Sequence, residues 1–142
     1  MTTKGNIMNE ILNNCKILLA LSGGVFGWIF GGFNSLIYAL IALAAIDYLT
    51  GVLLAVYEKE LSSDIGFKGI SKKVMMFALV AVGNIIDQHI IGSGSSLRTM
   101  LIMFYLSNEG ISIIENAGKI GLPLPQKLKD AIQKLNGNEN KK

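Results

Sequence analysis

Hydrophobic residues fall in four long runs along the chain, separated by short polar stretches. The runs cover residues 17–33, 36–56, 74–91 and 98–116. A helix needs about 20 residues to cross the hydrocarbon core of a bilayer, within a range of roughly 17–25. Each run therefore has the length of a spanning helix. The pattern predicts an all-α integral membrane protein with three to four transmembrane helices.

The second run gives the clearest signal for insertion. It contains eleven Leu, Ile or Val residues and one ionisable residue, Asp47. Each large aliphatic residue favours insertion by about 0.5 kcal/mol, whereas one Asp at the helix centre opposes it by about 3 kcal/mol. The sum favours insertion, so residues 36–56 are predicted to span the membrane.

Small residues recur at a spacing of four in the first two runs. Gly23, Gly27 and Gly31 follow one another in the first run, and Gly51 and Ala55 repeat the spacing in the second. In a membrane, small residues four apart allow two helix backbones to approach closely. These five positions are predicted to pack helices together. For the glycine-rich first run, a re-entrant hairpin leading into the second span is the alternative.

Amphipathic segments are expected at both ends of the membrane domain. Within residues 1–16 the apolar residues recur at helical spacing, with polar residues on the opposite face, which is typical of a lead-in helix lying on the membrane. Residues 117–142 form a tail in which a short amphipathic helix restarts after Pro125. The segment 57–73 is predicted to be a loop, with Ser71 capping the third span.

Composition supports the membrane assignment, because 51% of the 142 residues are hydrophobic, only 16% are charged and the mean hydropathy is +0.47. The net charge of +3 comes from lysines beside apolar runs, which argues against nucleic acid as a partner. Five of these lysines are expected at the inner membrane surface, where they contact the lipid headgroups: Lys72, Lys73, Lys127, Lys129 and Lys134.

The distribution of basic residues predicts the orientation. With four spans, the N-terminal segment, the central loop and the tail share one side, which collects twelve Lys residues, whereas the other side has only Arg98. Cytoplasmic loops hold the Lys and Arg excess. Both termini are therefore expected on the cytoplasmic side of a bacterial cytoplasmic membrane. A three-span arrangement would move only the N-terminus.

Polar residues also occur inside the predicted spans. An ionisable side chain within a membrane costs several kcal/mol unless it faces protein or water. These residues are therefore expected to line a water-filled pore or to form hydrogen bonds between helices in a closed bundle. The set comprises Asp47, Asn84, Asp87, Asn108, Glu109, Ser112 and Glu115.

Little in the sequence suggests an enzyme. The chain has one Cys and one His, and it lacks a glycine-rich phosphate-binding motif. No catalytic, cofactor-binding or metal-binding residues are expected, and no cofactor is implied.

Five short motifs occur in a fixed order between residues 36 and 135. They are Asp-Tyr-Leu-Thr-Gly at 47–51, Leu-Ser-Ser at 61–63, Gly-Ile-Ser-Lys-Lys at 69–73, Asn-Glu-Gly-Ile-Ser-Ile-Ile-Glu-Asn at 108–116 and Gly-Leu-Pro-Leu-Pro at 121–125. In this order they resemble the phage-lysis and toxin-secretion holin family of Gram-positive bacteria and their phages. The glycine-rich first run is not part of the resemblance.

The resemblance implies a holin, which oligomerises in the cytoplasmic membrane and forms large holes that release a cell-wall hydrolase or a toxin. Its implied partners are the lipid bilayer, other copies of itself and an antiholin, with an endolysin or toxin as a functional partner that needs no direct contact. Two other functions remain open: a small ion channel or transport subunit, and an antiholin or membrane adaptor without pore activity.

Overall fold

The protein is built of helices, and the computed structural model describes residues 2–92 and 94–137. The elements are α1 (Thr2–Phe30), α2 (Ser35–Tyr57), α3 (Ser63–Ile86), the π-helical turn η1 (Asp87–Ile91), α4 (Ser96–Ile120) and α5 (Gln126–Gly137). The described residues contain no strand, which confirms the predicted all-α membrane class. The last five residues of the predicted tail lie outside the described part.

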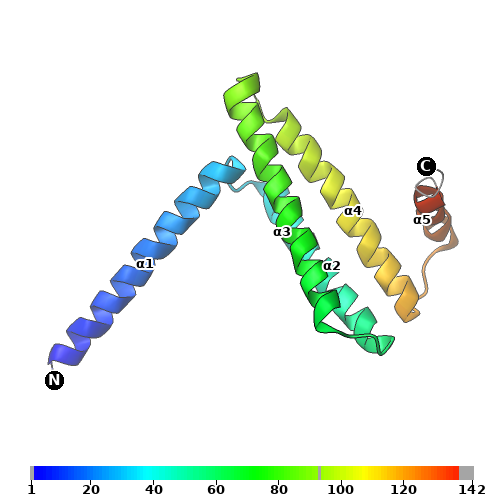
Figure 1. The fold of residues 1–142 in the computed structure, drawn as a ribbon, viewed down its shortest axis with the longest axis horizontal. Coiled ribbons are helices and arrows are strands. Elements are labelled where there is room, and N and C mark those ends of the chain that lie inside the picture. The colour runs from blue at the N-terminus through cyan, green and yellow to red at the C-terminus, as the bar shows by residue number, and fades with distance from the viewer. Residues whose placement is uncertain (1, 93, 138–142) are drawn as a thin grey trace.

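Helices α2, α3 and α4 pack into a three-helix unit, with α2 lying mainly along α4 (Figure 1). Their shared core is apolar because each helix turns one stripe of aliphatic residues inward, at spacings of three and four. Its buried members are Ile37, Leu40 and Ala44 from α2, Met76 and Val80 from α3, and Ile102 from α4.

Helix α3 begins at Ser63, well before the third span was predicted to begin at residue 74. The side chain of Ser62 caps it by accepting a hydrogen bond from the Ile65 N–H at 3.3 Å. The prediction that Ser71 is the cap is wrong, because its hydroxyl donates to the Phe67 carbonyl within the helix at 2.8 Å. Gly69, in the segment predicted to be a loop, lies within α3, and a Cβ there would lie 3.2 Å from the Tyr48 ring, so glycine allows α2 and α3 to approach closely.

Helix α1 combines the predicted lead-in and first span in one continuous helix of 29 residues. It ends because Gly31 and Gly32 adopt φ values of +70° and +88°, which glycine tolerates without strain. Gly31 therefore lies in the turn that follows α1 and not within the helix itself. Figure 1 shows α1 leaving the three-helix unit at this turn and extending away from it.

Within the described residues, three helical segments are long and apolar enough to cross a membrane: Gly5–Phe30, Ser35–Tyr57 and Ser63–Ile91. Helix α4, which contains the predicted fourth span, is not among them, and it carries four charged residues, Arg98, Glu109, Glu115 and Lys119. However, α4 runs beside α2 for most of its length. Polar contacts join the two helices both near their beginnings and towards their ends.

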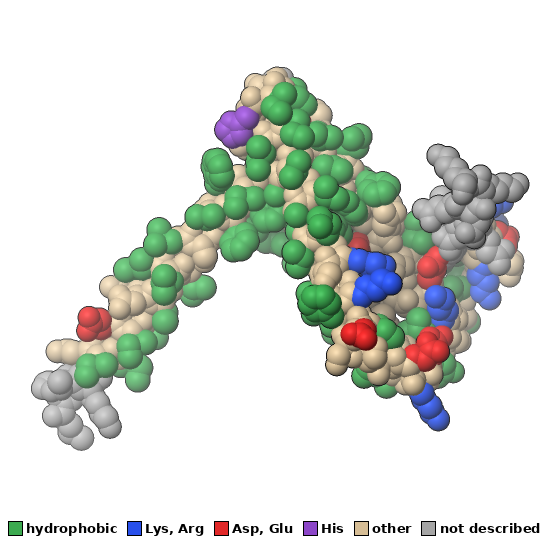
Figure 2. Space-filling view, in the orientation of Figure 1, with side chains coloured by type: hydrophobic (Ala, Val, Ile, Leu, Met, Phe, Trp, Pro, Cys, Tyr) green, Lys and Arg blue, Asp and Glu red, His purple; other side chains and the backbone are tan. Residues whose placement is uncertain are grey.

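The chain runs up and down through these helices. In Figure 1 the start of α1, the α2–α3 connection and the end of α4 lie on the lower side of the view, and the α1–α2 and α3–α4 connections lie above them. Figure 2 shows Lys, Asp and Glu side chains gathered towards the end of the three-helix unit that holds the α2–α3 connection, whereas mainly hydrophobic and uncharged side chains line α1.

Candidate functional site

Lys73 of α3 forms ion pairs with one carboxylate from each of the two neighbouring helices. Its Nζ lies 2.6 Å from Oδ2 of Asp47 on α2, and it also pairs with Oε2 of Glu109 on α4. The three side chains are largely buried, with 18%, 14% and 10% of their surfaces exposed, respectively. We call these three residues the Lys73 cluster. It joins all three helices of the unit at one point.

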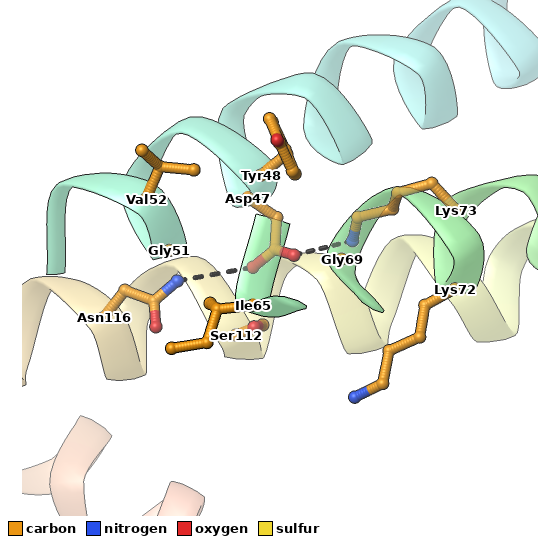
Figure 3. A pocket seen from close by; sticks show the side chains of 10 residues that line it. All are labelled: Asp47, Tyr48, Gly51, Val52, Ile65, Gly69, Lys72, Lys73, Ser112 and Asn116. Atoms are coloured by element: carbon orange, nitrogen blue, oxygen red, sulfur yellow. Dashed lines mark hydrogen bonds and ion pairs between the residues drawn. The ribbon is translucent and has the colours of Figure 1, made fainter. Parts of the chain in front are cut away.

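An amide extends the cluster towards the end of α4. The Asn116 side chain donates to Oγ1 of Thr50 at 3.1 Å and to Oδ1 of Asp47 at 3.5 Å. Beside these groups lies a cavity of about 200 Å³, lined by residues of α2, α3 and α4 that include Gly51, Gly69 and Ser112 (Figure 3). Because Gly51 and Gly69 have no side chains, the cavity stays open between the helices.

The electrostatics of the Lys73 cluster explain how charges can lie inside this bundle. A buried ion is tolerated when it is paired and hydrogen-bonded, and removing one partner of a buried pair costs about 3–5 kcal/mol. Here one ammonium faces two carboxylates, so the formal charge of the cluster is −1. Among the described residues, every buried side-chain nitrogen and oxygen atom has a hydrogen-bond partner.

Arg98 forms a second polar centre at the opposite end of the unit, where α1 joins it. The residue is only 2% exposed. Its guanidinium donates to the Phe30 carbonyl, to the Gly32 carbonyl at 3.0 Å and to Oδ1 of Asn34 at 3.5 Å. The last carbonyls of a helix have no partners within it, so Arg98 supplies the donors that end α1.

Asn84 of α3 completes this joint. Its amide donates to the carbonyls of Trp28 and Ile29 at 3.3 and 2.9 Å, and its Oδ1 accepts from Gln88 at 3.2 Å. A Cβ on Gly31 would lie 2.1 Å from Oδ1 of Asn84, so the turn can approach α3 only with glycine there. The end of α1 is thus fixed by buried polar groups from two helices.

Asp87 caps the beginning of α4. Its Oδ1 accepts from the Leu97 N–H at 3.1 Å and its Oδ2 from the Arg98 N–H at 2.8 Å. A carboxylate at a helix N-terminus also interacts favourably with the helix dipole. Helices α3 and α4 pack closely here: a Cβ on Gly83 would lie only 3.4 Å from Cα of Arg98.

The structure brings four of the predicted polar residues together in two centres. Asp47 and Glu109 belong to the Lys73 cluster, and Asn84 and Asp87 belong to the joint at Arg98. The remaining predicted polar residues lie elsewhere on α4: Ser112 lines the cavity, Glu115 is half-buried and Asn108 is exposed.

The predicted basic residues and the predicted small residues lie in differing surroundings. Lys73 is largely buried in its ion pairs, whereas Lys72, Lys127, Lys129 and Lys134 are exposed. Ala55 is buried, and a Cβ on Gly51 would lie 3.8 Å from Asn116. On α1, Gly23 has no atom within 4 Å of the Cβ position, and Gly27 approaches only Phe33, at 3.9 Å.

Sequence reasoning missed the ion-pairing role of Lys73 and the capping role of Arg98. Lys73 was interpreted as a membrane-flanking lysine because it precedes an apolar run, and Arg98 as a residue at the outer border of the fourth run. Both are the cations of buried centres. The sequence did contain a signal for the role of Lys73, because an ionised Asp47 inside a membrane span needs a counter-ion.

The family comparison supports an assignment for most of the chain. The protein-family model described as "Bacteriophage holin family" matches residues 24–137 of this chain. The described residues of the three-helix unit, the joint and α5 all fall within this range, whereas most of α1 precedes it.

The relatives named below are bacterial proteins that are themselves described as uncharacterised. A 14.9 kDa protein from the nagH 3′ region of Clostridium perfringens is 39% identical over 132 residues, covering 93% of this chain and 100% of the relative. Lin0175 of Listeria innocua is 43% identical over 117 residues, covering 82% and 83%. YqxH of Bacillus subtilis is 36% identical over 115 residues, covering 81% and 79%. No solved structure matches the chain.

Proposed function

Because the chain belongs to the bacteriophage holin family, we propose that it is a holin, which assembles in the cytoplasmic membrane into large non-specific holes. A cell-wall hydrolase or a toxin would leave the cell through these holes. In this proposal no residue is catalytic and no cofactor takes part. The partners are the bilayer and further copies of the chain, with an antiholin as a regulator.

The observation that carries the proposal is the isolation of α1. None of the apolar window in Gly5–Phe30 is buried within the chain, although it is long enough to cross a membrane. Within a bilayer such a helix is covered by lipid or by another copy. Gly23 and Gly24 leave open space beside the helix, as close packing with a second helix requires. The structure of one chain therefore leaves a surface available for assembly.

The proposed orientation places both termini in the cytoplasm, with α4 as the fourth crossing. Packing beside α2 supports this, because α4 then has a spanning neighbour along its polar face. Arg98, the sole basic residue at the other end, is buried in the joint. Apart from Lys16, midway along α1, the exposed lysines of the described chain lie on the α2–α3 side of the three-helix unit or on α5. Lys127, Lys129 and Lys134 of α5 would contact anionic lipid on that side.

The polar residues of the spans would change partners during assembly. In one chain the buried side-chain nitrogen and oxygen atoms of the described residues all have partners, as in a closed bundle. In a hole bounded by many copies, one face of each copy meets water, and charged side chains can then be hydrated. Both states avoid charges exposed to lipid.

The internally paired polar groups also favour the second candidate, an antiholin or membrane adaptor without pore activity. A closed bundle with a free apolar helix could bind a pore-forming partner without opening itself. The ion-channel alternative receives no comparable support, since the polar groups form two separate centres and not one ring.

Expression of the protein alone in a bacterium tests the proposal. The membrane potential and the release of a cytoplasmic fluorescent protein are followed together. A holin abolishes the potential and releases the fluorescent protein. Loss of the potential with the protein retained would indicate an ion channel, and no effect on either would indicate an antiholin or adaptor.

A further inference from the structure

The seam between α2 and α3 is incompletely closed. Helix α2 packs mainly on α4, and two apolar hollows of about 410 and 360 Å³ border both α2 and α3. The larger hollow is also lined by Phe26 and Phe30 of α1. Both are bounded by Ile41 on α2 and by Val74 and Phe77 on α3. The polar cavity of about 200 Å³ also reaches this seam. Lys73 lines that cavity and the smaller apolar hollow, so the seam is hollow on both sides of it.

Helix α3 is held firmly at its C-terminal end. Gly83 packs against the backbone of Arg98, Asn84 binds the end of α1, and Asp87 in the following turn binds the beginning of α4. In the other half of α3, Lys73 provides the polar link to α2 through Asp47. Figure 3 shows the Lys73 amine directed across the seam towards this carboxylate.

We propose that Lys73 is a latch: its ion pairs with Asp47 and Glu109 hold the N-terminal half of α3 against α2 and α4, and their release opens the α2–α3 seam. The firmly held C-terminal end of α3 is the hinge. This inference rests on the proposed function for its purpose, since an open seam would give neighbouring copies a polar surface with which to line a hole.

The surroundings of the chain decide the state of the latch. In lipid, opening would strand one ammonium and two carboxylates without partners, so the closed state is favoured. Where several copies border water, the same three groups are hydrated after they separate, and this penalty is removed. Dispersed copies therefore stay closed, and copies gathered around water open.

Thiol labelling of single copies tests the latch independently of lysis. Cys15 is replaced by Ser, and Ser112→Cys places a thiol in the cavity behind the latch. The protein is incorporated into lipid nanodiscs at one copy per disc and treated with a charged methanethiosulfonate reagent. We expect slow labelling of the parent protein and at least about tenfold faster labelling with Lys73→Met, because a broken buried pair strongly favours opening.

Two further variants separate the latch from simple misfolding. Lys73→Arg keeps the charge and should label within about twofold of the parent. Lys73→Met combined with Asp47→Asn and Glu109→Gln leaves no unpaired charge, so it should keep its helix content and label fast. Lys68→Met, at an exposed position on α3, is the matched control and should label like the parent. Slow labelling of the triple variant would show that packing alone closes the seam and would overturn the latch.

A cross-link across the seam relates the latch to release. Ala45→Cys and Ile70→Cys place thiols on opposite walls of the smaller apolar hollow, again without Cys15. A short, reversible bis-methanethiosulfonate should block release of cytoplasmic protein, and a reductant should restore it. Undiminished release from cross-linked protein would overturn the latch. If the parent protein releases nothing, the proposed holin function fails, while the labelling rates still decide on the latch.

Discussion

Asp87 holds the backbone of Arg98, accepting its N–H at 2.8 Å, while the Arg98 side chain holds the last carbonyls of α1. The two residues thus connect three helices through a chain of hydrogen bonds. Asp87 fixes where α4 begins, and that position places the guanidinium at the end of α1. The orientation of the apolar α1 consequently depends on a carboxylate that does not touch it.

Replacing Asp87 by Ala should destabilise the protein. Loss of a helix cap costs about 0.5–2 kcal/mol. The change also removes the carboxylate nearest the buried guanidinium, so we expect a total of at least about 2 kcal/mol. Unfolding in mixed micelles with increasing SDS, followed by circular dichroism, measures the effect. His89→Ala, at an exposed position in the same π-helical turn, is the control, and equal stability of the two variants would contradict the cap.

Replacing Arg98 by Met should loosen the end of α1 without dissolving the three-helix unit. The carbonyls of Phe30 and Gly32 lose their donor, so backbone amides in residues 28–34 should exchange hydrogen at least about tenfold faster, equivalent to about 1.4 kcal/mol of lost protection. Amides in the core of α2 should change little. Hydrogen exchange with mass spectrometry provides the measurement. Uniform acceleration over all helices would instead indicate global unfolding.

Adding bulk to the open glycine face of α1 should weaken self-association. Gly23→Leu with Gly27→Leu would hold two α1 backbones apart, and we expect roughly a tenfold loss of cross-linked oligomer, or about 1.4 kcal/mol. Gly31 is unsuitable for this test because its positive φ would strain any side chain. Ser22→Leu adds similar bulk on another face and should have a smaller effect. Unchanged cross-linking would place the contact between copies elsewhere.

The proposed orientation can be measured with single cysteines in a chain without Cys15. Ser63→Cys lies at the beginning of α3 and Ser95→Cys just before α4, and both positions are exposed. Impermeant thiol reagents added outside intact cells should label position 95 and spare position 63. Labelling of position 63 from outside would contradict the proposed orientation, because it would place the α2–α3 connection outside the cell.

The sequence was most informative about the composition of each long segment. It was least informative about which residues of different helices contact one another. Apolar runs predicted the membrane helices, because crossing a bilayer imposes length and hydropathy on each segment separately. The early start of α3 was readable in Ser62, which is followed by an acidic first turn at Asp64. The glycines at 66 and 69 obscured it, since the close approach that they allow is to Tyr48, which is distant in sequence.

The pairing of Lys73 with Asp47 depends on the packing of three helices. The two residues are 26 positions apart, and a lysine before an apolar run is equally typical of a membrane border. Similarly, the spacing of Gly31 continues the pattern of Gly23 and Gly27, but its conformation is set by the contact with Asn84. Local patterns identified the polar residues of the spans and did not identify which of them meet.

Helix α1 is longer than the hydrocarbon core of a bilayer is thick. A helix of 29 residues is about 43 Å long at 1.5 Å per residue, whereas the hydrocarbon core is about 30 Å thick. The surplus of about 13 Å is taken up by tilting or by leaving the polar first turns, with Asn9 and Glu10, among the headgroups. Since α1 is anchored at its last turn alone, its tilt adjusts to the thickness of the surrounding bilayer while α2, α3 and α4 keep their packing.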